Sequence, residues 1–235
     1  MEWITVKNEE ELGQSAADIF TQEINRRHAL VIGLATGSTP IPLYRELISR
    51  CEAGMIDFSG VKTVNLDEYV GLPQTHDQSY RYFMEGNLFR HINIDPANTH
   101  LPNGDTKDPE AECARYDALI DMLGGIDLQL LGIGNNGHIG FNEPADSFSN
   151  STQVVRLTES TIQANARFFA DPAEVPEYAI TMDIRHIMHA RKILLVAGSN
   201  KKNILDQAMN GSITPQVPAS ALQLHRDITV ISVRD

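Results

Sequence analysis

Four short stretches of this sequence combine glycine, hydroxyl and charged residues in patterns that suit chemistry. They cover residues 35–40, 67–73, 132–144 and 198–201. Each follows a short apolar run that is typical of a buried β-strand. Ligands of parallel α/β sheets bind beyond the carboxyl ends of the strands. Function is therefore expected in these four loops.

The loop 132–144 holds the strongest candidate for acid–base catalysis. His138 can carry protons near neutral pH when a second group fixes its ring and its tautomer. Glu143 and the amide of Asn136 lie close enough along the chain to do this. A histidine bonded only to backbone is the alternative interpretation, but the glycines and the proline of this irregular loop favour a proton carrier.

The same loop begins with Gly-Ile-Gly-Asn-Asn-Gly, which matches the spacing of a dinucleotide-binding motif. That motif works when a helix starts inside it and directs its N-terminus at the pyrophosphate. Gly140 and Pro144 oppose a helix here. Glu159 falls roughly where a ribose-binding acid would stand, but without the helix we predict no dinucleotide site.

Asp67 and Glu68 directly follow another apolar strand. Neighbouring side chains of an extended segment point in opposite directions, so one of the two is expected to face the cleft. A carboxylate in that position could act as a general base. The alternative is an aspartate that only caps a turn.

Two further turns could bind an anion. The first consists of Thr36, Gly37, Ser38 and Thr39. It precedes a predicted helix, whose free N–H groups and dipole attract phosphate. Lys201, in the second turn, could reach the same group. Either turn alone could be structural, with Thr39 capping the helix and Pro40 at its first position. Together they indicate a phosphorylated small molecule.

Metal binding finds little support among the eight histidines. His186 and His189 are three residues apart on a predicted helix, but the H-E-x-x-H pattern is absent and no acid spacing supports them. A G-x-S-x-G elbow is absent as well, which argues against a serine hydrolase. We expect no metal site.

Alternating strands and helices must position these loops. Strands are predicted at residues 29–34, 61–66, 126–131, 153–157, 178–182, 192–197 and 228–233. Helices are predicted at residues 9–27, 40–54, 80–91, 109–123, 159–169, 184–190 and 200–209. This order predicts an α/β fold: a single domain, residues 1–235, with an open, mostly parallel, Rossmann-like sheet covered by helices on both faces.

The composition narrows the class of protein further. The chain has 235 residues, of which 42% are hydrophobic, and a net charge of −12, so nucleic acid and anionic membranes are poor partners. No apolar run approaches the roughly 18 residues that span a bilayer, and the start lacks the layout of a signal peptide. Two cysteines suit a reducing cytoplasm. A small anionic ligand remains compatible with this charge.

Taken in order, these loops resemble the glucosamine-6-phosphate deaminase family. The matching stretches are residues 35–40, 65–72, 132–144, 167–169 and 198–201. The runs Asp-Glu-Tyr-Val-Gly-Leu and Gly-His-Ile-Gly-Phe-Asn-Glu-Pro are the most specific. The sister 6-phosphogluconolactonases share the fold and a Gly-His loop but continue toward Ser-Leu-Phe-Pro, so the Phe-Asn-Glu-Pro sequence favours the deaminase.

The resemblance implies conversion of glucosamine 6-phosphate and water to fructose 6-phosphate and ammonia in amino-sugar catabolism. His138, oriented by Glu143 and Asn136, would move the proton that opens the sugar ring. Asp67 would then remove the proton at C2. Proton transfers of this kind need neither metal nor organic cofactor.

The phosphate of the substrate would bind to the turn 36–39, to Arg167 and to Lys201. The resemblance also implies a mobile lid at about residues 151–181. Some family members carry aspartate in place of Asn136, where an asparagine stabilises a charged imidazole less well.

The allosteric members of the family carry Ser, Arg and Lys where this chain has Asp146, Gln153 and Val155. An acidic Asp146 would repel the phosphate of N-acetylglucosamine 6-phosphate, so we expect no activation by it. The choice between monomer and homo-oligomer stays open. Three alternative functions remain: a galactosamine-6-phosphate deaminase-isomerase, a 6-phosphogluconolactonase, and a non-catalytic sugar-phosphate sensor.

Overall fold

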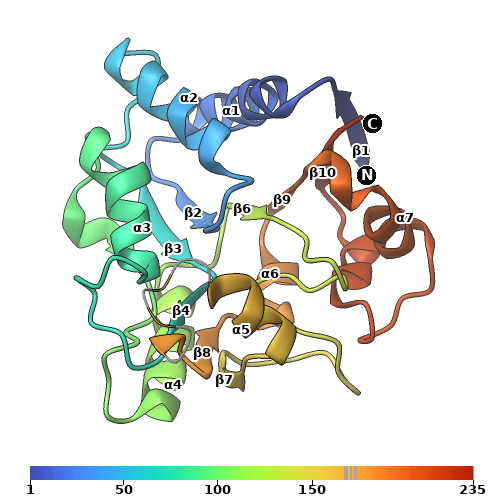
Figure 1. Ribbon diagram of the computed structural model, residues 1–235. Helices are drawn as coiled ribbons and strands as arrows, with labels where there is room; N and C mark the ends of the chain where they lie inside the picture. Colours follow the sequence, from blue (N-terminus) through green and yellow to red (C-terminus); the bar gives the residue numbers. More distant parts are fainter. Residues whose placement is uncertain (167–168, 170, 172–173, 235) are drawn as a thin grey trace.

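Seven parallel strands form the central sheet of the computed structural model, which describes residues 1–166, 169, 171 and 174–234 (Figure 1). In spatial order they are β1 (Glu2–Val6), β10 (Ile228–Val233), β9 (Lys192–Ala197), β6 (Leu128–Leu131), β2 (Val31–Leu34), β3 (Lys62–Asn65) and β5 (Thr99–His100). Every neighbouring pair runs parallel. The predicted parallel α/β sheet is confirmed.

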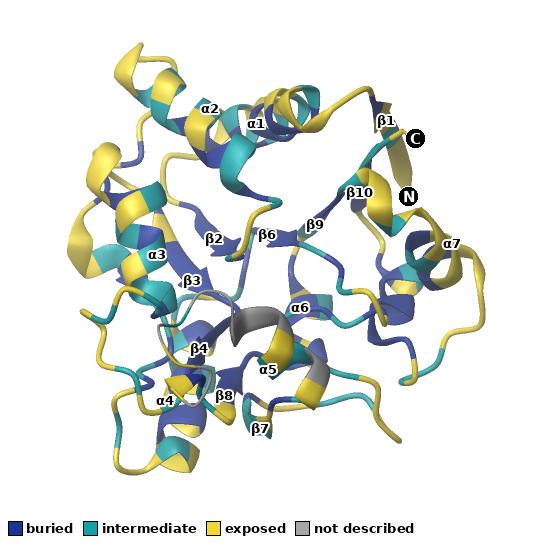
Figure 2. Ribbon diagram, viewed as in Figure 1, coloured by how far each residue is buried: buried dark blue, intermediate teal, exposed yellow. Residues whose placement is uncertain are grey.

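The strands β2, β6 and β9 are buried along almost their whole length because helices cover both faces of the sheet. All four residues of β2 and of β6 are buried, and so are the last five of β9. A strand buried on both faces does not alternate apolar and polar residues. Figure 2 shows these strands as the buried centre of the molecule, with exposed residues on the outer helices.

Helices α1 and α2 lie side by side on one face of the sheet, and α4 and α6 lie on the other (Figure 1). The helices are α1 (Glu9–Arg26), α2 (Ile41–Glu52), α3 (Tyr80–Asn87), α4 (Pro109–Met122), α5 (Glu159–Ala166), α6 (Ile184–His189) and α7 (Lys202–Asn210). Asn8 starts α1 by accepting the backbone N–H of Glu11 at 2.8 Å, as an N-cap residue does. None of the helices in the described ranges combines the length and apolar character that crossing a bilayer requires.

A second, antiparallel sheet of three strands was not predicted. It consists of β4 (Asp67–Tyr69), β8 (Tyr178–Thr181) and β7 (Gln153–Arg156), in that order. The chain passes from β3 into β4 across the single residue Leu66, which joins the two sheets. A small apolar cluster that includes Tyr69, Phe141, Leu157 and Ala179 packs at this sheet. The second sheet therefore holds the Asp67 segment next to the loop 132–144.

Several predicted boundaries need correction. Thr39 does not cap α2, because that helix starts at Ile41 after Pro40 and no side chain caps it. The predicted helix 80–91 ends at Asn87 and is followed by a separate single turn of 3-10 helix, η1 (Phe89–His91).

Strands β1 and β5 and the 3-10 helix η5 (Pro218–Leu224) were missed. Strand β1 is an edge strand with one buried residue, Val6, so its apolar pattern is weak.

Candidate active site

The four polar loops gather at one edge of the central sheet. They follow β2, β3, β6 and β9, which are neighbours in the order β9-β6-β2-β3. Because these strands are parallel, their carboxyl ends lie at the same edge. The predicted meeting of the loops is thus a consequence of the strand order.

His138 and Glu143 face each other within the loop 132–144. Nδ1 of His138 is 3.3 Å from Oε1 of Glu143, and the two side chains are 28% and 15% exposed. Burial alone would raise the pKa of Glu143, but hydrogen bonds and the charge of His138 outweigh it and hold that pKa below its usual value. The acid is therefore ionised beside a histidine that solvent can reach.

Asn136 binds the carboxylate rather than the imidazole. Its Nδ2 donates to Oε2 of Glu143 at 2.6 Å, and its Oδ1 accepts the backbone N–H of His138 at 3.2 Å. Asn136 thus holds Glu143 through its carboxylate and His138 through its backbone N–H. Within the described residues, Nδ1 of His138 has Glu143 as its ionic neighbour and no hydrogen bond of good geometry.

The glycines of this loop make room for the histidine. A Cβ on Gly134 would lie 2.2 Å from Nε2 of His138, so a side chain there is excluded. No helix starts between residues 132 and 144. The Gly-x-Gly spacing therefore accommodates an imidazole, and the helix that a dinucleotide motif requires does not start in this loop.

Asp67 and Glu68 point to different surroundings, as the strand geometry predicts. Glu68 accepts the backbone N–H groups of Tyr80 and Arg81 at 2.9 Å each, at the start of α3. Asp67 is 6% exposed, and its Oδ2 lies 3.5 Å from the place of a Cβ on Gly140, against the histidine loop. Burial, with a smaller contribution from the charge of Glu68, raises the pKa of Asp67 to about 8. Asp67 is thus a carboxyl group suited to general-base work near neutral pH.

The predicted phosphate turn lies beside these groups at the end of β2. Gly37 has φ +100, a left-handed conformation that glycine adopts readily. Gly37 and Ser38 are exposed, while Thr36 and Thr39 are half-buried. The hydroxyl of Tyr44 anchors the base of the turn by donating to the carbonyl of Ala35 at 2.5 Å.

Lys201 connects two of the loops. Its Nζ donates to Oδ1 of Asn135, which follows β6. Burial lowers the pKa of Lys201. Arg167, the other predicted phosphate ligand, lies outside the described residues, as does part of the predicted lid.

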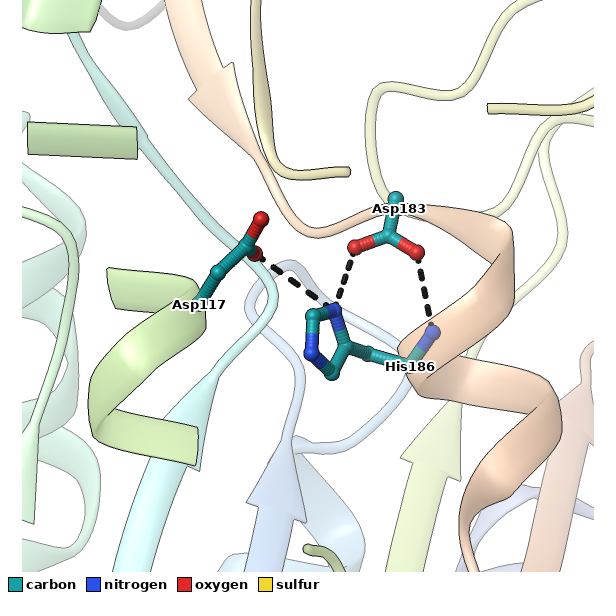
Figure 3. A group of neighbouring side chains, drawn as sticks. All are labelled: Asp117, Asp183 and His186. Carbon is teal, nitrogen blue, oxygen red and sulfur yellow. Dashed lines mark hydrogen bonds and ion pairs between the residues drawn. The ribbon is translucent and has the colours of Figure 1, made fainter. Parts of the chain in front are cut away.

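A second cluster of titratable groups consists of Asp117, Asp183 and His186 (Figure 3). Nδ1 of His186 donates to Oδ2 of Asp183 at 2.5 Å and lies 3.4 Å from Oδ1 of Asp117. Acidic partners for His186, which the sequence pattern did not indicate, therefore come from α4 and from the start of α6. Burial lowers the pKa of His186, but Asp183 and Asp117 raise it by more.

This cluster is arranged as a charged hydrogen-bonded pair. Asp183 also caps α6 by accepting the backbone N–H of His186 at 2.9 Å. The carboxylates beside His186 favour its protonated form, in agreement with the direction of its pKa shift. The arrangement suits stabilisation of the fold.

Two polar residues of the active-site edge were missed by sequence reasoning. Asn135, the partner of Lys201, lies inside the loop 132–144 but stood out only as part of the glycine motif. Thr161 donates its hydroxyl to Oε1 of Glu143 at 3.0 Å from α5. No motif surrounds Thr161, so only the fold reveals this contact.

The fold and the site together define an α/β protein whose ligand-binding edge carries groups suited to proton transfer. The family model for glucosamine-6-phosphate isomerases and 6-phosphogluconolactonases matches residues 7–231. Over 232 residues the chain is 59% identical to a glucosamine-6-phosphate deaminase of Lachnoclostridium phytofermentans, with 98% of each chain covered. The chain therefore belongs to the glucosamine-6-phosphate isomerase/6-phosphogluconolactonase family.

Solved structures agree with this membership. A structure described as a monomeric glucosamine-6-phosphate deaminase superposes with a TM-score of 0.96 at 45% identity, covering 100% of this chain and 98% of that one. The 6-phosphogluconolactonase of Thermotoga maritima superposes with a TM-score of 0.80 at 17% identity, covering 100% and 99%. The second likeness concerns the fold alone.

Proposed function

We propose that this protein is a glucosamine-6-phosphate deaminase, a hydrolase that forms fructose 6-phosphate and ammonia from glucosamine 6-phosphate and water. The observation that carries the proposal is that Asp67 lies against the loop that carries the His138–Glu143 pair. The relatives that are 59% and 45% identical carry the same activity in their names.

The first chemical step is opening of the pyranose ring. His138 carries the proton between the ring oxygen and the C1 hydroxyl, and ionised Glu143 holds its ring. Asn136 keeps Glu143 in place. A histidine that is 28% exposed can reach a sugar entering from solvent.

The second step is removal of the proton at C2 by Asp67, which gives an enolamine. The proton returns at C1, and the resulting imine takes up water and releases ammonia. A base with a pKa of about 8 holds the abstracted proton well enough to deliver it to C1.

The phosphate group binds to the turn 36–39 and to Lys201, with Arg167 as a further ligand. The exposed Gly37 and Ser38 leave backbone N–H groups open at this turn. Residues 151–181 act as a lid over the sugar. The enzyme works in the cytoplasm, where its free cysteines, Cys51 and Cys113, stay reduced.

Three substrates separate this proposal from its alternatives. Glucosamine 6-phosphate, galactosamine 6-phosphate and 6-phosphogluconolactone are offered in turn, with ammonia, ketose phosphate and acid release measured. We expect equimolar ammonia and fructose 6-phosphate from the first substrate, and loss of both in Asp67→Asn.

Preference for the galactosamine epimer, or hydrolysis of the lactone alone, would replace the proposed substrate. Tight binding of glucosamine 6-phosphate without turnover would indicate a sensor instead.

A further inference from the structure

Thr161 supplies a hydroxyl group to the oxygen of Glu143 that faces His138. Its Oγ1 is 3.0 Å from Oε1 of Glu143, and the same Oε1 is 3.3 Å from Nδ1 of His138. An ionised carboxylate can only accept hydrogen bonds, so the hydroxyl of Thr161 is the donor. One oxygen atom is thus shared between the proton carrier and a side chain of α5.

Thr158 extends this contact into a chain of hydroxyl groups. Its Oγ1 lies 2.9 Å from Oγ1 of Thr161. Because the proton of Thr161 is directed at Glu143, Thr158 is the donor in this contact. Oγ1 of Thr158 in turn accepts the backbone N–H of Thr161 at 3.3 Å, as an N-cap residue does. Hydrogen bonds in such a chain polarise and strengthen one another.

The start of α5 is fixed relative to the loop that carries Glu143. Ile162, the neighbour of Thr161, packs against the small cluster that contains Phe141. Its backbone N–H donates to the carbonyl of Thr158 at 2.9 Å. Phe141 is two residues from Glu143, so the same apolar contacts place both ends of the Thr161–Glu143 hydrogen bond.

Glu143 is held through both of its carboxylate oxygens. Asn136 donates to Oε2 at 2.6 Å, and Thr161 donates to Oε1. A glutamate side chain has three rotatable bonds, and a single hydrogen bond leaves its carboxylate free to turn. The second hydrogen bond sets the plane of the carboxylate, and with it the direction in which Oε1 meets His138.

We propose that Thr161 is a positioning residue of the ring-opening step, whose hydroxyl fixes Oε1 of Glu143 against His138. This role rests on the deaminase function proposed above. It assigns to α5 a part in the chemistry that goes beyond covering the substrate.

Thr161→Val and Thr161→Ser test this role, because valine keeps the shape of threonine and serine keeps the hydroxyl. We expect kcat of the valine variant to fall about tenfold with KM within about twofold, as for loss of one hydrogen bond to a charged group. The acidic limb of its kcat profile moves to higher pH, because the carboxylate loses a donor. Serine restores most of the rate. Thr5→Val, at an exposed position of the edge strand β1, serves as the matched control with unchanged kinetics.

A double-mutant cycle separates positioning from general damage to α5. In a Glu143→Gln background, Thr161→Val should cost no further activity, since the carboxylate it orients is gone. An unchanged kcat and pH profile in Thr161→Val would overturn the inference, and so would a full additional loss in the Glu143→Gln background. Wild-type protein that releases no ammonia would overturn the proposed function and this role with it, whereas normal wild-type turnover confines a failure to Thr161.

Discussion

Two histidine–carboxylate pairs in the described part of the chain, His138–Glu143 and His186–Asp183, differ in almost every physical respect. His138 meets Glu143 at 3.3 Å in a glycine-rich loop, and its side chain is 28% exposed. His186 meets Asp183 at 2.5 Å at the start of a helix, and the two side chains are 4% and 0% exposed. The first pair is open to a substrate, and the second is enclosed by the fold.

The difference shows that the local backbone structure decides whether a histidine and a carboxylate form a stabilising pair or a pair open to substrate. In the helix, Asp183 and His186 are three residues apart, so a single carboxylate caps the backbone and binds the ring. In the loop, Glu143 is oriented by side chains instead, Asn136 among them. A pair held by side chains can change partners as a proton moves, whereas a pair built into a helix cap contributes stability.

Replacing Asp67 should have the largest effect and should separate activity from stability most clearly. Asp67→Asn removes the base, and we expect kcat to fall about 1000-fold or more. Burial raises the pKa of Asp67 to about 8, above the value of an unfolded chain, so this carboxyl group lowers the stability of the wild type progressively as pH rises from about 4 to about 8. At pH 9 the unfolding free energy of Asp67→Asn should therefore be roughly 2 kcal/mol higher than that of the wild type.

Activity assays and thermal unfolding at pH 6 and pH 9 check both effects of Asp67→Asn. The stability gain should be smaller at pH 6, where the wild-type carboxyl group is already protonated. A variant that is less stable than wild type at pH 9 would contradict the electrostatic part of this account.

Breaking the buried pair of His186 and Asp183 should lower stability and leave activity nearly unchanged, which is the opposite of the result expected for Asp67→Asn. Asp183→Asn leaves His186 without its counter-charge and weakens the cap of α6, which should cost about 3 kcal/mol of unfolding free energy. The folded variant should keep kcat within about twofold, because the partners of this pair, Asp117 and Arg185 among them, are not the proposed catalytic groups. Denaturant unfolding and kinetics at low temperature measure the two quantities.

The pH dependence of the stability loss in Asp183→Asn provides the control. The pKa of His186 is raised by its acidic neighbours, so its stabilising effect is complete below about pH 6.5 and fades as pH rises through the folded value. The pKa of Asp183 is lowered by His186 against the effect of burial, so its contribution fades only as pH falls below about 4. The cost of Asp183→Asn should thus be larger at pH 6 than at pH 9. Equal costs would argue against a charged pair.

Asn136→Asp should make the His138–Glu143 pair more like the His186–Asp183 pair, because it adds a second carboxylate near the histidine. The new carboxylate replaces an amide that donates to Oε2 of Glu143, so negative charge accumulates beside His138. Such charge favours the protonated imidazole, and we expect the pH–rate profile to move to higher pH. The profile of kcat between pH 5 and pH 9 is the measurement, and an unchanged profile would contradict the assigned place of Asn136.

The smallest effect is expected from N-acetylglucosamine 6-phosphate, which should not activate the enzyme. Gln153 and Val155 line a cavity of about 310 Å³ that also borders Glu143, so an effector bound there could reach the loop pair. Gln153, Val155 and the nearby Asp146 supply no cation for a phosphate, and Arg156, which also lines the cavity, is paired with Glu177 at 3.5 Å. N-acetylglucosamine 6-phosphate should change neither kcat nor KM. A shift of either constant at saturating effector would overturn the expectation.

The sequence allowed the four polar loops to be placed at one sheet edge because each of them follows the end of a strand. The apolar runs of β2, β6 and β9 predicted a parallel sheet, and the pleat predicted that Asp67 and Glu68 diverge. The second sheet escaped prediction because β4 has only three residues and pairs with a strand over 100 residues away.

Side-chain contacts between distant elements were beyond sequence reasoning. Asp117 on α4 meets His186 on α6, and Thr161 on α5 meets Glu143, without any shared pattern in the sequence. The turn at Thr39 was misjudged for a local reason: Pro40 ends the turn, and α2 starts one residue later without a side-chain cap. Contacts set by the fold therefore define both histidine environments.

The measurement that tests the account most directly is kcat for ammonia release in His138→Gln and His186→Gln, compared at pH 7 on folded protein. We predict a loss of about 1000-fold in the first variant, with stability close to wild type, because a proton carrier is removed from a solvent-accessible loop. We predict kcat within about twofold in the second, with lower stability. Retained activity in His138→Gln, or an equal loss in both variants, would contradict the assignment of proton transfer to the loop pair.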